Sequence, residues 1–244
     1  MDGHPLLTQR LVGLACLLRG IEAWRILDRV LDPAKIHLPL IGIPRPPHEA
    51  AVVLAGLWLL AALAFTLDYR RRVSGAALAA VMAYVLLMDQ QTYSSHLYLL
   101  CLLVAILSLA EGSVARLLLR MQLSIVYGFA ALTKLTPVYL SGVILAVNLP
   151  PWAPPAWQRV EVLAPLAVAS VMAEAFLAIA LWSARWRPAA WVVGVGFHLA
   201  CVVFLAPAVR FQLAIFSLAM IALYPVFGPL RRPAALARPA PALS

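Results

Sequence analysis

A lysine and two histidines stand in long apolar stretches, where their chemistry is unusual. Lys134 ends one such stretch, and the nearest acidic residues in the sequence are Glu111 and Glu161. His96 opens a second stretch and His198 lies inside a third. An amine taken out of water loses basicity and can act as a general base when nothing nearby stabilises its cation. Imidazoles beside it can carry protons or stabilise an anion. These three residues are therefore the catalytic candidates.

Each of the three also has a structural interpretation, which the sequence leaves open. Lys134 would snorkel to the membrane interface, as lysines at helix ends commonly do. His96 would cap its helix or bond a carbonyl group. His198, in the middle of a helix, would serve as a hydrogen-bond partner for a neighbouring helix.

Four further residues are candidates for binding a cofactor. They are Glu174, Tyr127, Tyr98 and Arg210. Glu174 lies near the middle of an apolar segment. Burying an ionisable group there costs free energy, so we treat Glu174 as a functional candidate. The two tyrosines would equally be packing residues or part of an interfacial aromatic belt. An apolar cavity among such groups would admit a lipid-soluble ring compound, so a quinol is the cofactor that we predict.

The elements that position these residues are membrane helices. The chain has 244 residues, of which 64% are hydrophobic and 12% charged, with a mean hydropathy of +0.92. This exceeds what a soluble core of this size needs to bury. Backbone groups in lipid are satisfied only by helices or closed barrels, and alternating strand patterns are absent. The sequence therefore predicts an all-α, polytopic integral membrane bundle.

The apolar segments predict about eight transmembrane helices, each near the length that the hydrocarbon core requires. The predicted ranges are 9–30, 49–67, 73–89, 95–110, 114–133, 161–183, 188–206 and 209–227. Arginines between them fall on one side, which the positive-inside rule makes cytoplasmic, together with both termini. We expect one transmembrane domain, 1–230, and a disordered, Pro/Ala-rich cytoplasmic tail, 231–244.

Two segments are harder to assign. The first helix contains Arg19, Glu22, Arg25, Asp28 and Arg29 at spacings that allow pairing along one face. It either lines the bundle or lies in the interface as an amphipathic helix. The segment 138–149 is apolar but too short to cross, which indicates a re-entrant or interfacial piece.

The charge and the cysteine spacing indicate which partners and ligands to expect besides lipid. The net charge of +9 comes from basic residues between apolar runs, so we expect no nucleic-acid binding. The three cysteines, Cys16, Cys101 and Cys201, lie in apolar runs without metal-ligand spacing, which predicts packing residues and no metal site. Glu174 is also a possible structural partner for Arg19 or Arg25.

The predicted topology brings four polar residues toward the outer leaflet. Helix direction places His96, Lys134, His198 and Arg210 at the outer ends or outer halves of four different helices. This placement follows from hydropathy and charge bias alone. It is the geometric basis for a shared site.

Three stretches resemble one membrane family. They are SSHLYLLCLL (94–103), RMQLSIVYGFAALTKL (120–135) and FHLACVVF (197–204). They look like the transmembrane core of vitamin K-dependent γ-carboxylases, which is shared with horizontally transferred transmembrane (HTTM) proteins. The resemblance covers about 200 residues through an ordered set of motifs.

The resemblance implies a site where a lysine deprotonates a reduced quinone, which then reacts with oxygen to give an alkoxide base. On matching positions Lys134 takes the base role, His96 and His198 lie near the quinone, and Glu174 is an acidic position of the following helix. Arg210 has no secure counterpart.

Two departures bear on the substrate. The carboxylases have a paired Lys-Lys and a following Asp where this chain has Thr133 and Thr136. Their large domain after the membrane core has no equivalent before Ser244, so we do not expect carboxylation of peptide glutamates. The alternatives are an enzyme acting on a quinol-like lipid-soluble substrate, a non-catalytic subunit in a larger membrane complex and, ranked last, a transporter. The usage of Ala, Arg and Pro suggests a bacterial inner membrane.

Overall fold

Helices form all the regular secondary structure in the described part of the chain. The structure is a computed structural model that describes residues 6–25, 27, 31–32, 34, 36, 38, 41–90, 92–205 and 207–228. Its long helices are α1 (Leu6–Arg25), α3 (His48–Thr66), α4 (Arg71–Met88), α5 (Ser95–Leu109), α6 (Gly112–Thr133), α9 (Val160–Ala180), α10 (Arg187–Phe204) and α11 (Pro207–Ile221). Short helices α7 (Pro137–Leu140) and α8 (Val143–Val147) and 3-10 turns η1 (Pro155–Gln158) and η2 (Tyr224–Phe227) complete it.

The prediction of a polytopic helical membrane protein is confirmed. Within the described residues, 6 helical segments are long and apolar enough to cross a membrane: α3, α4, α6, α9, α10 and the segment Arg210–Phe227. Helix α5 is apolar but shorter. Large apolar side chains such as Leu60, Ile179 and Val192 are 66%, 75% and 75% exposed, as expected for surfaces covered by lipid. The number of crossings and the cytoplasmic location of the termini stay predictions.

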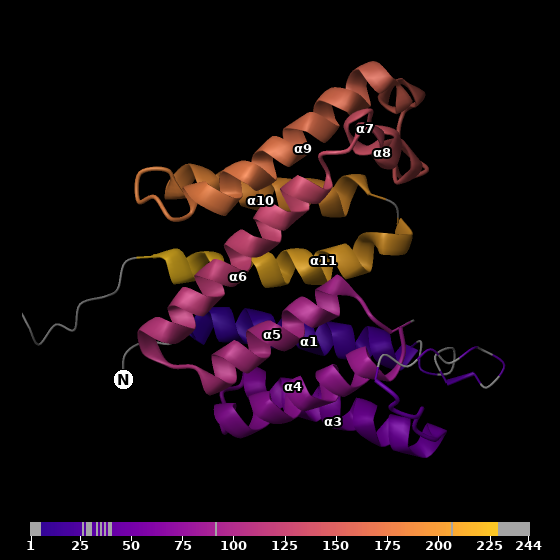
Figure 1. The fold of residues 1–244 in the computed structure, drawn as a ribbon, viewed down its shortest axis with the longest axis vertical. Coiled ribbons are helices and arrows are strands. Elements are labelled where there is room, and N and C mark those ends of the chain that lie inside the picture. The colour runs from indigo at the N-terminus through magenta and orange to yellow at the C-terminus, as the bar shows by residue number, and fades with distance from the viewer. Residues whose placement is uncertain are drawn as a thin grey trace, which may run out of the picture.

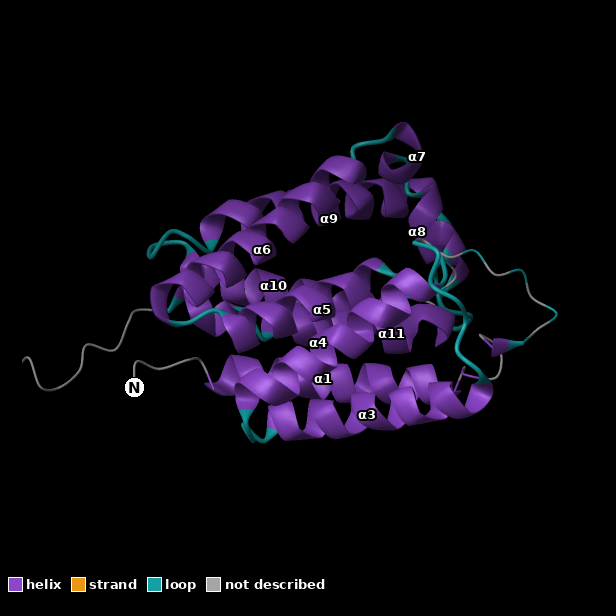
Figure 2. Ribbon diagram, turned by 60° about the horizontal axis from the view of Figure 1, so that its bottom comes forward, coloured by secondary structure: helices purple, strands orange, loops and turns teal. Residues whose placement is uncertain are grey.

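The helices lie side by side in two groups (Figure 1). In the first group α1 packs against α3, α3 against α4, and α4 against α5. In the second group α6 packs against α9, and α9 against α10. Helix α11 contacts α10 on one side and α1 on the other, so it joins the two groups. Figure 2 shows the same order, with α3 and α9 on opposite sides.

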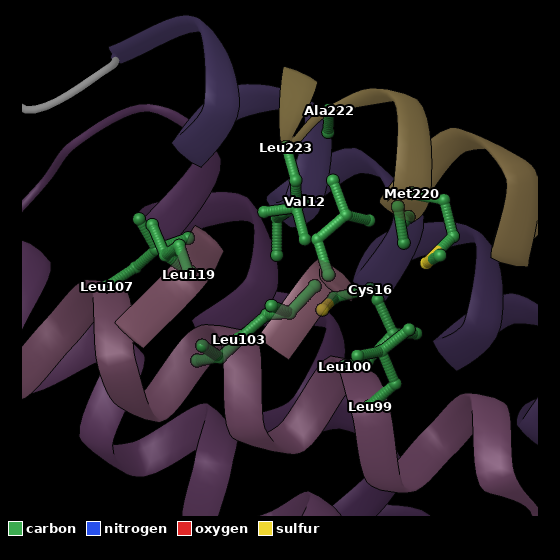
Figure 3. Packing of buried hydrophobic residues seen from close by; sticks show 14 of the residues in the cluster. Val12, Cys16, Leu99, Leu100, Leu103, Leu107, Leu119, Met220, Ala222 and Leu223 are labelled. Atoms are coloured by element: carbon green, nitrogen blue, oxygen red, sulfur yellow. The ribbon is translucent and has the colours of Figure 1, made fainter. Parts of the chain in front are cut away.

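The hydrophobic core is centred where α1, α5 and α11 meet (Figure 3). Val12 and Cys16 of α1, Leu103 of α5, Met220 of α11, and Leu223 just after α11 are all fully buried. Their complete burial reflects close packing of the three helices. The burial of Cys16 agrees with a packing role.

Helix α1 lines the bundle, as the first of its two predicted placements requires. It packs against α3, α5 and α11. Its Arg19 and Glu22 form an ion pair within the helix, and Gln212 of α11 donates to Glu22 at 2.9 Å. The predicted partners Asp28 and Arg29 lie outside the described residues, as does the predicted tail 231–244.

The arginine clusters gather at one end of the bundle. Arg71 and Arg72, at the start of α4, pair with Glu111, which directly precedes α6. Arg116 of α6 and Arg187 of α10 line one cavity nearby. The ends of α6 and α10 that contain Lys134 and Phe204 therefore lie at the opposite end, beside α7 and α8 (Figure 1).

Two boundaries differ from the sequence prediction. The last predicted helix ends at Ile221, and a 3-10 turn that includes Pro225 follows, because proline has no backbone N–H to continue the ladder. The short segment 138–149 forms α7 and α8, separated by Gly142 at φ +82°. A Cβ on Gly142 would lie 2.6 Å from the backbone carbon of Leu163, so glycine allows this turn to sit on α9.

Candidate functional site

The end of α6 holds a lysine–glutamate ion pair. Helix α6 stops at Lys134 because Thr136 is extended and Pro137 starts the next helix. The Lys134 Nζ lies 2.7 Å from Oε1 of Glu174, which comes from the middle of α9. The side chains are 27% and 6% exposed, respectively. The second carboxylate oxygen, Oε2, is buried and has no hydrogen-bond partner among the described residues.

This pair corrects two expectations from the sequence. The Lys134 ammonium has a carboxylate partner, so it is not the unpaired cation that the local sequence indicates. Glu174 does not pair with helix α1, where Arg19 already has Glu22. The packing of α6 against α9 joins residues 40 positions apart, which no local spacing reveals.

Aromatic faces enclose the lysine. Its Nζ lies 5.4 Å from the ring centre of Tyr139 and 5.8 Å from that of Phe197, within cation–π range. The Tyr139 hydroxyl is held 2.8 Å from Ser170 Oγ of α9. The Lys134 ammonium therefore lies close to two aromatic rings, and aromatic rings stack well on the ring of a ligand.

A chain of buried hydroxyl and imidazole groups lies beside the ion pair. The Tyr127 hydroxyl is 2.7 Å from His198 Nε2 and 2.7 Å from the Tyr224 hydroxyl. All three residues are at most 2% exposed. A Cβ on Gly194 would lie 1.8 Å from the Tyr224 oxygen, so the glycine makes room for this ring. Three groups that both donate and accept can pass a proton along their length.

The two predicted catalytic histidines both lie close to one phenyl ring. The ring of Phe216 is centred 4.5 Å from the His96 ring and 6.0 Å from the His198 ring. His198 is within electrostatic range of Lys134, whereas His96 interacts with Arg19 and Glu22. The structure thus brings Lys134, Glu174, Tyr127 and His198 together. His96 is outside this group and lies against Phe216.

The remaining two predicted binding residues lie apart from this cluster. Tyr98 is 47% exposed on α5, as a residue of the aromatic belt would be. Arg210 donates to the Leu205 carbonyl at 3.5 Å, and its Nε is buried with no partner within the described ranges.

Comparison with known proteins places the first group of helices in a family. Residues 6–116 match the family model of the HTTM domain. Over these residues the chain is similar to the HTTM family. The match spans α1, α3, α4, α5 and the start of α6, so it includes His96 and ends before Lys134. No curated protein and no solved structure gives a match.

A cavity of about 340 Å³ lies within the matched HTTM helices, away from Lys134. It is formed by α1, α3, α4 and the start of α5, with apolar walls that include Trp58, Val85 and Leu97. Arg19 and Gln212 supply polar groups. Its volume suits a small ligand, and no motif in the sequence predicts it.

The sequence does not distinguish three residues of the site from ordinary packing residues. Tyr224, Phe216 and Gly194 lie in apolar runs, where such residues ordinarily pack. Their positions matter because α11 and η2 fold back against α10 and α6. In the described residues no group of His, Cys, Asp and Glu side chains is arranged to hold a metal ion.

Proposed function

We propose that this HTTM protein is a membrane enzyme that removes a proton from a hydroxyl group of a lipid-soluble, quinol-like ring. The observation that supports it is the partly exposed Lys134–Glu174 ion pair, at the end of the bundle opposite the arginine clusters. Ionisable groups in a membrane interior are costly and are retained for function. The resemblance to the carboxylase core agrees with this class of substrate.

The pair supplies a base through an internal proton transfer. Two opposite charges in a low-dielectric setting are poorly solvated, and moving one proton from the ammonium to the carboxylate neutralises both. Lys134 is then a neutral amine and can accept a proton from a ligand hydroxyl, becoming an ammonium again. Glu174, 2.7 Å from the amine, keeps the first proton while Lys134 holds the proton of the ligand, and Glu174 releases its proton to water when the ligand anion leaves.

Two features fit a hydroxylated ring. The unpartnered Oε2 of Glu174 is a buried acceptor that a ligand hydroxyl can satisfy. The faces of Tyr139 and Phe197, on either side of the amine, suit stacking. A quinol has both groups, and its apolar tail would remain in lipid.

The test is oxidation of a short-chain naphthoquinol by the full chain in lipid nanodiscs, in air-saturated buffer where dissolved oxygen takes the two electrons and becomes hydrogen peroxide, with the absorbance of the quinone as readout. Lys134→Met and Glu174→Gln should each lower the rate about 100-fold or more, the usual range for loss of a proton-transfer group. Glu161→Gln, an exposed carboxylate on the same helix, is the matched control and should leave the rate unchanged.

Two results would oppose the proposal. One is turnover by Lys134→Met equal to that of the unchanged chain. The other is loss of turnover on filling the distant cavity with Ala55→Phe, combined with no effect at Lys134.

A second candidate is a non-catalytic subunit of a membrane complex. The observation in its favour is that the polar groups pair with one another and that both imidazoles pack near the apolar ring of Phe216. Such a cluster also stabilises a bundle without chemistry. Cross-linking in native membranes followed by purification should then recover a stoichiometric partner, and Lys134→Met should alter stability without altering any quinol oxidation.

A further inference from the structure

A second cavity, of about 320 Å³, lies at the arginine end of the bundle. It is formed by the starts of α6 and α10 and by the turn η2. Its lining includes Ser113, Arg116, Arg120, Arg187, Phe227 and Gly228. Three guanidinium groups share this space, and no acidic residue in the described chain lines it.

Two of the arginines are held in place by backbone carbonyl groups. Arg120 Nε donates to the Val226 carbonyl at 2.8 Å, and its guanidinium lies 5.4 Å from the Phe227 ring centre. Arg187 Nε donates to the Leu181 carbonyl at 3.2 Å. Arg120 Nη2 also donates to the Gly228 carbonyl at 3.5 Å. These bonds fix the positions of the charges, and each guanidinium has five N–H donors, so further donors are left for a ligand.

The third arginine has no internal role. Arg116 makes no hydrogen bond or ion pair within the described ranges, and it is close enough to Arg120 to interact electrostatically, as is Arg187. Other arginines near the bundle ends have carboxylate partners, such as Arg72 with Glu111 and Arg45 with Asp89. Three like charges gathered without a counter-charge repel one another unless an anion joins them.

Helix ends add to the attraction for an anion. Ser113 lies in the first turn of α6, and Arg187 is the first residue of α10. The free N–H groups and the dipole of a helix N-terminus favour negative charge. The arginine side chains and both helix N-termini therefore all favour the binding of an anion.

We propose that this cavity binds the phosphate group of an anionic phospholipid. Guanidinium groups bind phosphate through paired N–H donors, and basic pockets between membrane helices accept lipid headgroups. A lipid is the favoured source because the cavity borders exposed apolar surface: Leu117, which lines it, is 49% exposed, and Trp182 and Trp186 are 43% and 51% exposed. Acyl chains would lie along this surface.

The test is native mass spectrometry of the full chain released from vesicles of equal parts phosphatidylglycerol and phosphatidylcholine. The unchanged protein should retain phosphatidylglycerol preferentially. Arg116→Gln should lower that preference about fivefold, and adding Arg187→Gln should lower it about 25-fold, from the usual contribution of one arginine at an anionic surface. Arg185→Gln is the matched control, since Arg185 stacks over Trp186 and does not line the cavity.

Arg116→Gln is the decisive variant because Arg116 makes no contact that folding requires. An equal loss in Arg185→Gln would overturn the proposal, since it would indicate attraction by the whole basic surface. Absence of any preference for phosphatidylglycerol would also overturn it. In phosphatidylcholine nanodiscs, stabilisation by inorganic phosphate alone, without lipid preference, would refute the lipid source.

Discussion

Replacing Lys134 by methionine tests whether the ion pair is a coupled unit. Glu174, with a side chain 6% exposed, would keep a buried charge with neither oxygen partnered in the described structure. Removing one partner of a buried pair costs about 3–5 kcal/mol. Lys134 is 27% exposed, so water screens the pair, and we expect a loss of about 2–3 kcal/mol in the free energy of unfolding.

The second substitution removes the unpaired charge. Glu174→Gln alone leaves an amine that water still reaches, and should cost about 1 kcal/mol. The double variant has no buried charge and should also cost about 1 kcal/mol, so the two substitutions should be coupled by about 2 kcal/mol.

The assay is reversible unfolding in mixed micelles, followed by tryptophan fluorescence. Lys134→Met combined with Glu161→Gln gives a control cycle on the same two helices, for which the effects should add. If Lys134→Met and Glu174→Gln also add to within about 0.5 kcal/mol, the pair contributes no coupling and the reasoning fails.

Three further predictions use the same unfolding assay. Tyr127→Phe removes the central hydroxyl and leaves His198 and Tyr224 unpaired, so it should cost about 2–3 kcal/mol, whereas Tyr224→Phe should cost about 1 kcal/mol; equal losses would contradict the chain of hydrogen bonds. Gly194→Ala places a Cβ 1.8 Å from the Tyr224 oxygen and should cost about 1–3 kcal/mol by displacing that ring. Gly142→Ala, at φ +82° against the α9 backbone, should cost about 2 kcal/mol, and an unchanged midpoint would disprove the tight turn.

Most of the fold follows from the sequence because membrane helices are specified locally. Apolar length fixes where α3, α4, α6, α9 and α10 lie, within a few residues of the predicted ranges. The arginines between them predict that one end of the bundle is basic, and the structure brings these arginines together. The sequence also predicts similarity to the HTTM family, and a family match covers residues 6–116, which include the stretch 94–103 but not 120–135 or 197–204.

The site was only partly predictable because it depends on which helices are neighbours. Lys134 and Glu174 were both singled out as costly ionisable groups, but their pairing requires the α6–α9 contact. His96 and His198 both contact Phe216 because α11 packs between the two helix groups. Hydropathy gives each helix a depth, but it does not give the order of helices around the bundle.

Photolabelling in a bilayer tests the central claim most directly, because it locates the ring without requiring turnover. The full chain in nanodiscs would be irradiated with an azido-naphthoquinone and the modified peptide identified. The proposal predicts labelling within residues 133–142 or 197–204, next to Lys134, and loss of that label in Lys134→Met. Labelling confined to the α1, α3 and α4 cavity, or labelling that Lys134→Met leaves unchanged, would contradict the proposal.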